Sequence, residues 1–263
     1  MRLNGKIAVI TGASMGIGEA LAKLFVEEGA KVVLSSRDLG RVEAARQRIG
    51  SLEKTSAVAC DVCDREQIQA LLRETLAKFG QIDLWVNNAG FGLADSIESM
   101  DMAVCRRMFD TNLFGAIDAM QVVAPVMRKQ GSGCIINVSS VAGSIAVPYS
   151  AAYGATKHAL NCITRATGLE LQGTGIRVMN VCPGYVKSEF AVNLVRGNQS
   201  NKLGGGAKRG VSSDYVARAI LRGYLDEKRE IIVPWYYRPV IWLSRLIPGT
   251  FGKLMLSRVK PVE

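Results

Sequence analysis

The fold is decided by a stretch near the start of the chain, IAVITGASMGIG at residues 7–18. Its first four residues form a short apolar run between polar neighbours, which predicts a buried strand. Glycines at 12, 16 and 18 then allow a tight turn, a close approach of the backbone to a pyrophosphate, and close packing of helix on strand. The helix that opens there offers unpaired N–H groups to the phosphate. The stretch therefore predicts a strand–turn–helix unit that binds a dinucleotide, with the spacing GxxxGxG.

Short apolar runs and helix-period segments alternate along the rest of the chain, which predicts βαβ units and a parallel sheet. Strands are expected at Ile7–Ile10, Lys31–Ser35, Ser56–Cys60, Leu84–Asn87, Cys134–Val138, Arg177–Val181 and Ile231–Val233. Helices are expected at 17–28, 39–49, 65–78, 101–129, 152–171 and 213–225. At 263 residues the chain fits one α/β domain. We expect a catalytic unit at 1–233 and an extension at 234–263.

Composition narrows the classes of protein. Six scattered cysteines in predicted core elements favour reduced thiols and the cytoplasm. No signal peptide and no run of 18 apolar residues is seen, so we expect no spanning helix. The net charge of +10 suits solubility, an anionic cofactor or anionic lipid. Nucleic acid ranks last among the partners, because no arginine-rich arm or nucleic-acid motif is present.

The same glycine-rich turn contains an alternative motif. Residues 12–16 read GASMG and match GxSxG, the nucleophile elbow of serine hydrolases, with Ser14 as nucleophile. Such an enzyme needs a later acid and then a histidine, and the chain has one histidine, His158. We keep a serine hydrolase as a remote alternative.

A second polar constellation lies at residues 153–157, which read YGATK. On a helix, Tyr153 and Lys157 share one face. A free tyrosine has a pKa of about 10, and a nearby cation favours the phenolate. We therefore expect Lys157 to lower the pKa of Tyr153 toward the range useful for acid–base catalysis. Ser140 follows a predicted strand and can hydrogen-bond a carbonyl that Tyr153 protonates.

Taken together, the motifs resemble the short-chain dehydrogenase/reductase family. They are TGxxxGxG, Asn87-Asn88-Ala89-Gly90, Asn112, Ser140, Tyr153-x-x-x-Lys157 and Pro183-Gly184, in that order, over residues 5 to about 233. The resemblance implies a doubly wound, Rossmann-type parallel sheet. It also implies hydride transfer between NAD(P) and an alcohol/carbonyl pair.

The resemblance assigns the catalytic roles residue by residue. Tyr153 would be the general acid/base, and Lys157 would hold the nicotinamide ribose and tune Tyr153. Ser140, selected over Ser139 by its spacing to the tyrosine, would polarise the carbonyl. Asn112 would hold a water that relays protons to Lys157.

The resemblance also implies a set of cofactor-binding residues. They are Gly12, Ser14, Met15, Gly16, Ile17, Gly18, Ser36, Arg37, Arg41, Asp61, Val62, Asn88, Ala89, Gly90, Tyr153, Lys157, Pro183, Gly184, Val186 and Ser188. Asp61 would accept from the adenine amino group, and we interpret the flanking Cys60 and Cys63 as incidental rather than as a metal or redox site. Ser188 stands where relatives often carry threonine.

The end of the second strand indicates which dinucleotide is preferred. Members that prefer NAD carry an acid at the position of Ser36, which binds the ribose 2′-hydroxyl. Here Arg37 follows instead, and a guanidinium fits a 2′-phosphate. Arg41 could assist from the next helix. We therefore expect NADPH to be preferred, although the glycine loop carries Met15 where many NADP-preferring members have a basic residue.

The substrate region is expected to be apolar. The resemblance implies that it is built from Ser140, Ala142, Tyr149, Tyr185 and Phe190, with Ile145, Val147, Val192 and Leu194 nearby. This favours a bulky ketone or aldehyde of lipid, steroid or oxoacyl type. Segment 187–210 loses periodicity and is interpreted as a lid.

The extension at 234–263 is rich in aromatic and aliphatic residues and carries five Lys/Arg against one Glu. It could cover the cleft, form a subunit interface or contact a membrane surface through rings and cations. The resemblance implies a homodimer or homotetramer that pairs the helices at 101–129 and 152–171. A catalytically silent nucleotide-binding regulatory protein stays open as the alternative to an enzyme.

Overall fold

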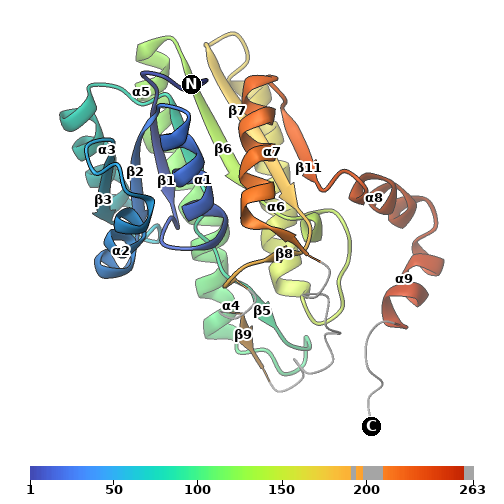
Figure 1. Ribbon diagram of the computed structural model, residues 1–263. Coiled ribbons are helices and arrows are strands. Elements are labelled where there is room, and N and C mark those ends of the chain that lie inside the picture. Colours follow the sequence, from blue (N-terminus) through green and yellow to red (C-terminus); the bar gives the residue numbers. More distant parts are fainter. Residues whose placement is uncertain (191–193, 198–209, 258–263) are drawn as a thin grey trace.

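The computed structural model describes residues 1–190, 194–197 and 210–257. A seven-stranded parallel sheet runs through the centre with helices on both faces (Figure 1). Its strands are β1 Ile7–Thr11, β2 Lys31–Ser36, β3 Thr55–Ala59, β4 Leu84–Asn87, β6 Gly133–Val138, β7 Ile176–Pro183 and β11 Glu230–Val233. The spatial order β11-β7-β6-β4-β1-β2-β3 reverses direction between β1 and β4. This confirms the doubly wound parallel sheet and all seven strands expected from the sequence.

The helices of the two layers follow the strands in alternation. They are α1 Gly16–Glu27, α2 Leu39–Ile49, α3 Arg65–Phe79, α4 Met102–Phe109, α5 Gly115–Gln130, α6 Ala151–Glu170 and α7 Ser213–Leu225. Two further helices, α8 Tyr237–Leu246 and α9 Pro248–Leu256, lie in the extension. Short strand pairs join β5 Leu93–Ala94 to β9 Val195–Arg196 and β8 Val186–Lys187 to β10 Val211–Ser212.

Successive residues of a strand face opposite layers, because side chains alternate along a strand. In β1, Ala8 and Ile10 belong to a core shared with α1 and α7, whereas Val9 belongs to a core shared with α3 and α5. Both faces of the strand are therefore dry, which explains the continuous apolar runs that identified the strands. Figure 1 shows α1 and α7 side by side on one face of the sheet.

The prediction of one continuous helix at 101–129 is wrong in one respect. The helix is interrupted by a π-helix at Asp110–Phe114, between α4 and α5. A π-helix shifts the backbone hydrogen bonds to i→i+5 and is found mostly at functional sites. It contains Asn112, so the interruption falls on a predicted catalytic residue.

The extension forms helices that stand to one side of the sheet (Figure 1). The inward residues of α8 and α9, Ile241 and Phe251, form a small core with Val141 and Ile145 of the loop after β6. No helix among the residues described is long and apolar enough to span a bilayer. Most of the predicted lid, including Val192, falls at 191–193 and 198–209, outside the described residues. Residues 258–263 of the extension also lie outside them.

The turn between α6 and β7 offers a matched pair of glycine substitutions. Gly173 and Gly175 both have positive φ, near +80°, but a methyl group on Gly173 meets open space, whereas one on Gly175 overlaps the Gly131 carbonyl oxygen. We expect Gly173→Ala to lower the free energy of unfolding by about 1 kcal/mol and Gly175→Ala by at least about 3 kcal/mol. Urea denaturation of both variants measures the difference. Equal losses of unfolding free energy in the two variants would contradict the close approach of the turn at Gly175 to the turn at Gly131.

Candidate active site

The dinucleotide cradle lies where the carboxyl ends of the parallel strands meet, at the reversal of strand order between β1 and β4. A methyl group on Gly12 would stand 2.8 Å from the Ala89 Cα, and one on Gly18 would stand 2.5 Å from the Gly12 carbonyl oxygen. Asn88 fixes the turn, since its Nδ2 donates to the Thr11 and Gly12 carbonyls, each at 3.0 Å. Only glycine fits at positions 12 and 18.

The start of α1 is suited to an anion. The residue before α1, Met15, provides no side-chain cap for the first N–H groups, as is also the case for α5, α6, α8 and α9. At Gly16, with φ +62°, a methyl group would come no closer to other atoms than the Ser188 Cβ at 3.6 Å. The structure thus brings Ser188 to the glycine turn. These residues fit the pyrophosphate of a dinucleotide.

The residues expected around the adenine ribose lie at the end of β2. Ser36 is the last residue of β2, and its Oγ donates to the Asp38 carbonyl at 2.9 Å. Arg37 is exposed. Arg41 pairs with Asp38, with 3.6 Å between Nε and Oδ2, and its side chain is exposed. Arg41 is therefore engaged by a carboxylate, and Arg37 forms no ion pair among the described residues.

The loop after β3 contains Asp61 and Val62, the two residues expected beside the adenine. The Asp61 Oδ1 accepts from the Cys63 N–H at 3.0 Å, and Val62 is buried, with its carbonyl against Gly115 of α5. Cys60 is buried, and Cys63 lies 3.3 Å from the Thr111 hydroxyl. Both cysteines are free thiols.

Asn112 is buried and binds the chain that leaves β4. Its Nδ2 donates to the Phe91 carbonyl at 2.8 Å and to the Thr156 Oγ1 at 3.2 Å, while its Oδ1 accepts from the Phe91 N–H at 3.0 Å. A methyl group on Gly90 would meet this Oδ1 at 2.9 Å and the Lys157 Nζ at 3.7 Å. The amide of Asn112 is thus committed to holding the NNAG loop and α6 together.

The two adjacent serines after β6 have different partners. The Ser139 Oγ donates to the Lys157 carbonyl at 3.2 Å. The Ser140 Oγ donates to the Pro183 carbonyl at 3.4 Å and accepts from the Ala142 N–H at 3.1 Å. The Ser140 hydroxyl is also near enough to Tyr153 to favour its phenolate and so to lower the pKa of that phenol. Ser140, and not Ser139, therefore faces the phenol.

Tyr153 and Lys157 lie one turn apart on α6, as expected, but their titration differs from the expectation. Burial raises the pKa of Tyr153 to about 12, and the hydrogen bond with Ser140 only partly opposes this. Burial likewise lowers the pKa of Lys157 to about 8. The Lys157 Nζ donates to the Val138 carbonyl at 3.0 Å and lies 5.9 Å from the centroid of the Tyr153 ring. Desolvation is the largest influence on the phenol, so the pKa of Tyr153 is shifted upward, opposite to the lowered value expected from the sequence.

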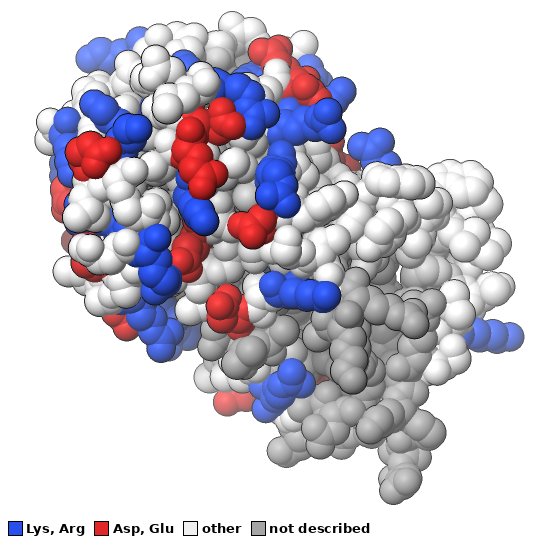
Figure 2. Space-filling model, viewed as in Figure 1, with Lys and Arg blue, Asp and Glu red and all other residues white. Residues whose placement is uncertain are grey.

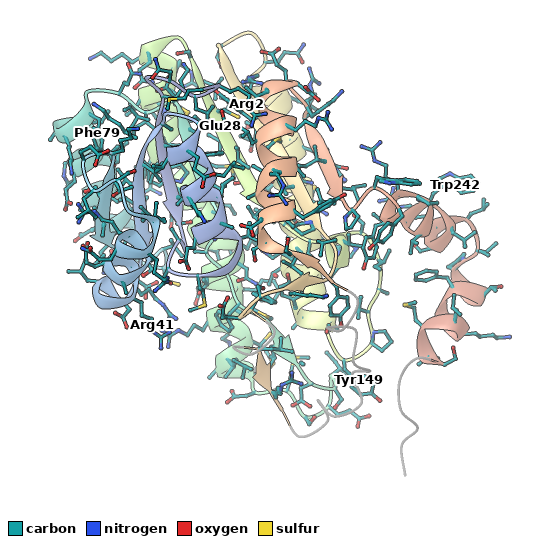
Figure 3. The ribbon with its side chains drawn as sticks, viewed as in Figure 1. Arg2, Glu28, Arg41, Phe79, Tyr149 and Trp242 are labelled. Carbon is teal, nitrogen blue, oxygen red and sulfur yellow. The ribbon has the colours of Figure 1, made fainter. Side chains whose placement is uncertain are left out.

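An aromatic ring lies beside the phenol of Tyr153. The rings of Phe190 and Tyr153 lie 5.8 Å apart. Tyr149 has a positive φ of 59°, and its carbonyl accepts from the Asp95 N–H at 3.0 Å, which holds the loop before α6 (Figure 3). Ile145 and Val147 pack against the extension instead of the cleft. Val186 pairs with Val211 in the β8–β10 pair.

One contact joins the extension to this site, and sequence analysis missed it. A methyl group on Gly184 would overlap the ring of Tyr237, the first residue of α8, and the Tyr185 N–H donates to the Tyr237 hydroxyl at 3.5 Å. Thr156 was also missed as a partner of Asn112, although it stands inside the YGATK stretch. No residue spacing identifies Tyr237, because its partner lies 52 positions away.

A glycine-lined turn, a helix start without a side-chain cap, and Ser140, Tyr153 and Lys157 lie together at the carboxyl edge of a Rossmann-type sheet. Residues 6–199 match the family model described as short chain dehydrogenase. The chain belongs to the short-chain dehydrogenase/reductase family.

Curated relatives match nearly the whole chain. A dehydrogenase/reductase SDR family protein 7-like of Drosophila melanogaster is 30% identical over 270 residues, covering 100% of this chain and 83% of the relative. An uncharacterized oxidoreductase of Staphylococcus saprophyticus is 35% identical over 236 residues, covering 89% of this chain and 96% of the relative.

Solved structures show the same fold with nicotinamide cofactors. The 3-ketoacyl-(acyl-carrier-protein) reductase of Brucella melitensis, complexed with NADH, superposes with a TM-score of 0.79 at 29% identity, covering 88% of this chain and 97% of the other. A metagenomic short-chain oxidoreductase in complex with NADP superposes with a TM-score of 0.74 at 31% identity, covering 89% and 98%.

The buried ammonium of Lys157 is expected to cost stability. Its folded pKa of about 8 lies below the ordinary 10.5, so the unfolded chain binds more protons between these values, and stability rises with pH there. At pH 7 the cost is present in full. We expect Lys157→Met to raise the free energy of unfolding at pH 7 by roughly 1–3 kcal/mol, while removing activity.

The pH dependence distinguishes this cost from a packing effect. The stability gap between Lys157→Met and the wild type should close as the pH rises from 8 toward 10, as measured by urea denaturation. Tyr153 does not interfere, because its raised pKa moves its contribution above pH 10. The exposed Lys129→Met serves as control and should show no such closing. A gap that stays constant with pH would contradict the buried, titrating ammonium.

Proposed function

We propose that the protein is an NADP(H)-dependent oxidoreductase that reduces an apolar ketone or aldehyde to an alcohol. One observation carries the proposal: Tyr153 is a half-buried phenol, neutral at pH 7, that is influenced by the Ser140 hydroxyl and stands beside Lys157 at the edge of a dinucleotide cradle. A neutral phenol donates a proton, which is what reduction of a carbonyl requires from the protein.

In this proposal each polar group has one task. Ser140 donates a hydrogen bond to the carbonyl oxygen, and Tyr153 transfers its proton to that oxygen as the carbon–oxygen double bond becomes a single bond. The bound reduced nicotinamide supplies the hydride that forms the new carbon–hydrogen bond. Lys157 holds its ammonium near the phenol and offers the remaining protons to the ribose. Asn112 keeps Gly90 and Thr156 in place around Lys157.

One observation supports the apolar substrate: the Phe190 ring stands 5.8 Å from the Tyr153 ring. A relative of the same fold is a 3-ketoacyl reductase, which fits an oxoacyl substrate among lipid-like and steroid-like carbonyls. The division into a catalytic unit at 1–233 and an extension at 234–263, a homodimer or homotetramer, and contact of the extension with a membrane belong to the same proposal.

The alternative of a nucleotide-binding protein without turnover predicts no carbonyl-dependent oxidation of NADPH. The complete set of Asn112, Ser140, Tyr153 and Lys157 favours the enzyme. A serine hydrolase is disfavoured by membership in an oxidoreductase family. Its required histidine, His158, is exposed on α6, with its Nδ1 2.9 Å from the Gly154 carbonyl.

Removing the phenolic hydroxyl tests the proposed reaction. With a panel of apolar ketones and aldehydes, we expect Tyr153→Phe to lower kcat/KM for NADPH oxidation by about 10²–10⁴-fold, because general acid catalysis is lost. Binding of NADPH, followed by fluorescence titration, should stay within about twofold of the wild type. The exposed Tyr215→Phe on α7 is the matched control. Turnover that survives in Tyr153→Phe would overturn the assignment.

Cofactor preference is tested at the end of β2. A guanidinium on the 2′-phosphate should favour NADPH over NADH by at least about tenfold in kcat/KM, or ~1.4 kcal/mol. Arg37→Ala should remove most of this ratio by weakening NADPH alone, whereas Arg73→Ala on the far helix α3 should leave it unchanged. Comparable kcat/KM values for both cofactors in the wild type would refute the preference.

A further inference from the structure

We infer that the outward face of α8, together with the exposed side chains beside it on α9, docks onto an anionic lipid bilayer. This names the surface and the lipid charge for the membrane contact proposed above, and it does not depend on the reaction. We define the α8–α9 surface by its exposed apolar residues Trp235, Trp242, Leu243, Leu246, Leu254 and Leu256.

Helix α8 carries apolar side chains on both of its faces. Tyr237, Val240 and Ile241, at helical spacing, pack against Val141 and Ile145 and anchor the helix to the body. The opposite face needs no apolar residue for this packing. It nevertheless presents Trp242 and Leu246, whose exposed fractions are 65% and 59%. Large apolar side chains gathered on the uncovered face of a helix mark a surface that docks onto another apolar environment.

The charge of the same surface has one sign. Arg238, Arg245 and Lys253 belong to the same two helices, with Arg245 at the hollow between them and α6, and the sequence holds no Asp or Glu between Pro234 and Ser257. None of the three cations forms an ion pair within the described parts of the chain. Figure 2 shows the contrast: blue and red mix over the body, whereas the end formed by α8 and α9 is white and blue.

These two properties together select a bilayer over a second copy of this chain. An isologous contact would bring two copies of the same cationic patch together, with no carboxylate in the patch to pair Arg238, Arg245 and Lys253. A bilayer with anionic headgroups provides an apolar layer for Trp242 and Leu246 and opposite charges for the cations. Tryptophan is suited to this boundary, because its ring is apolar and its N–H is polar.

The location of the surface leaves the dinucleotide site clear. Arg41, at the adenine end, and Trp242 lie at opposite ends of the molecule (Figure 3). Docking through α8 therefore leaves the adenine end exposed to water. The surface is also held firmly, since Phe251 of α9 and Ile241 of α8 are buried in the same small core.

The experiment is co-sedimentation of the full-length protein with vesicles, compared between phosphatidylcholine alone and an equimolar mixture with phosphatidylglycerol. We expect binding to the anionic vesicles and a decrease of at least about tenfold in the partition coefficient for Trp242→Gln/Leu246→Gln, since two large apolar side chains leave the interface. The matched control Ile97→Gln/Leu39→Gln changes two side chains that are exposed to 75% and 53% elsewhere, and should bind like the wild type.

The contribution of charge has its own pair of variants. Arg238→Gln/Arg245→Gln should lose the preference for anionic over neutral vesicles, whereas Arg73→Gln/Arg128→Gln, with the same loss of net charge on α3 and α5, should keep it. Tryptophan emission gives a second readout: anionic vesicles should shift it to the blue in the wild type and less in Trp242→Gln.

Three outcomes would overturn the inference. They are absence of the wild type from the anionic pellet, equal binding by the Trp242→Gln/Leu246→Gln variant, or a change in that variant's oligomeric mass in vesicle-free sedimentation velocity, which would make the surface a subunit interface. Tyr153→Phe should bind vesicles like the wild type, so a failure of the proposed reaction and a failure of docking give different results.

Discussion

The site depends on one hydrogen bond, from the Lys157 ammonium to the Val138 carbonyl at the carboxyl end of β6. It fixes α6 against the sheet at the point where the strand ends, so that Tyr153, one turn earlier, faces Ser140. The ammonium is dehydrated there, which lowers its pKa and makes this arrangement costly to the fold. Two hydrogen bonds hold this part of α6 in place. Asn112 donates to the Thr156 hydroxyl, and Ser139 donates to the Lys157 carbonyl. The buried ammonium is a local instability maintained for chemistry.

Much of the fold is readable from the sequence because its physical causes are local. The strands are dry on both faces and so appear as unbroken apolar runs, and helices such as α2 and α3 begin after Asp38 and Asp64, whose carboxylates cap them. The glycines at 12 and 18 also predict the turn from the sequence alone, because the backbone approaches them too closely for any residue with a side chain. The Tyr153–Lys157 pair follows from helical spacing alone.

The features that could not be predicted arise from contacts between distant segments. The π-helix at Asp110–Phe114 depends on Asn112 reaching Phe91, and nothing in the apolar periodicity marks it. The tyrosine pKa depends on how much water the fold excludes, which spacing does not report. In the extension, Pro239 and Pro248 stand in the first turns of the short helices α8 and α9, where a missing N–H is harmless.

The ring of Tyr237 against Gly184 makes the extension and the Pro183–Gly184 turn parts of one mechanical unit. The same turn accepts the hydrogen bond of Ser140 through its Pro183 carbonyl. Thermodynamic linkage is reciprocal, so a ligand that favours the present position of this turn also favours the seated position of α8. Conversely, a partner that binds α8 in its present position stabilises the turn at Pro183 and Gly184, and with it the position of Ser140, by the same free energy. The extension and the site would therefore be coupled without sharing a ligand.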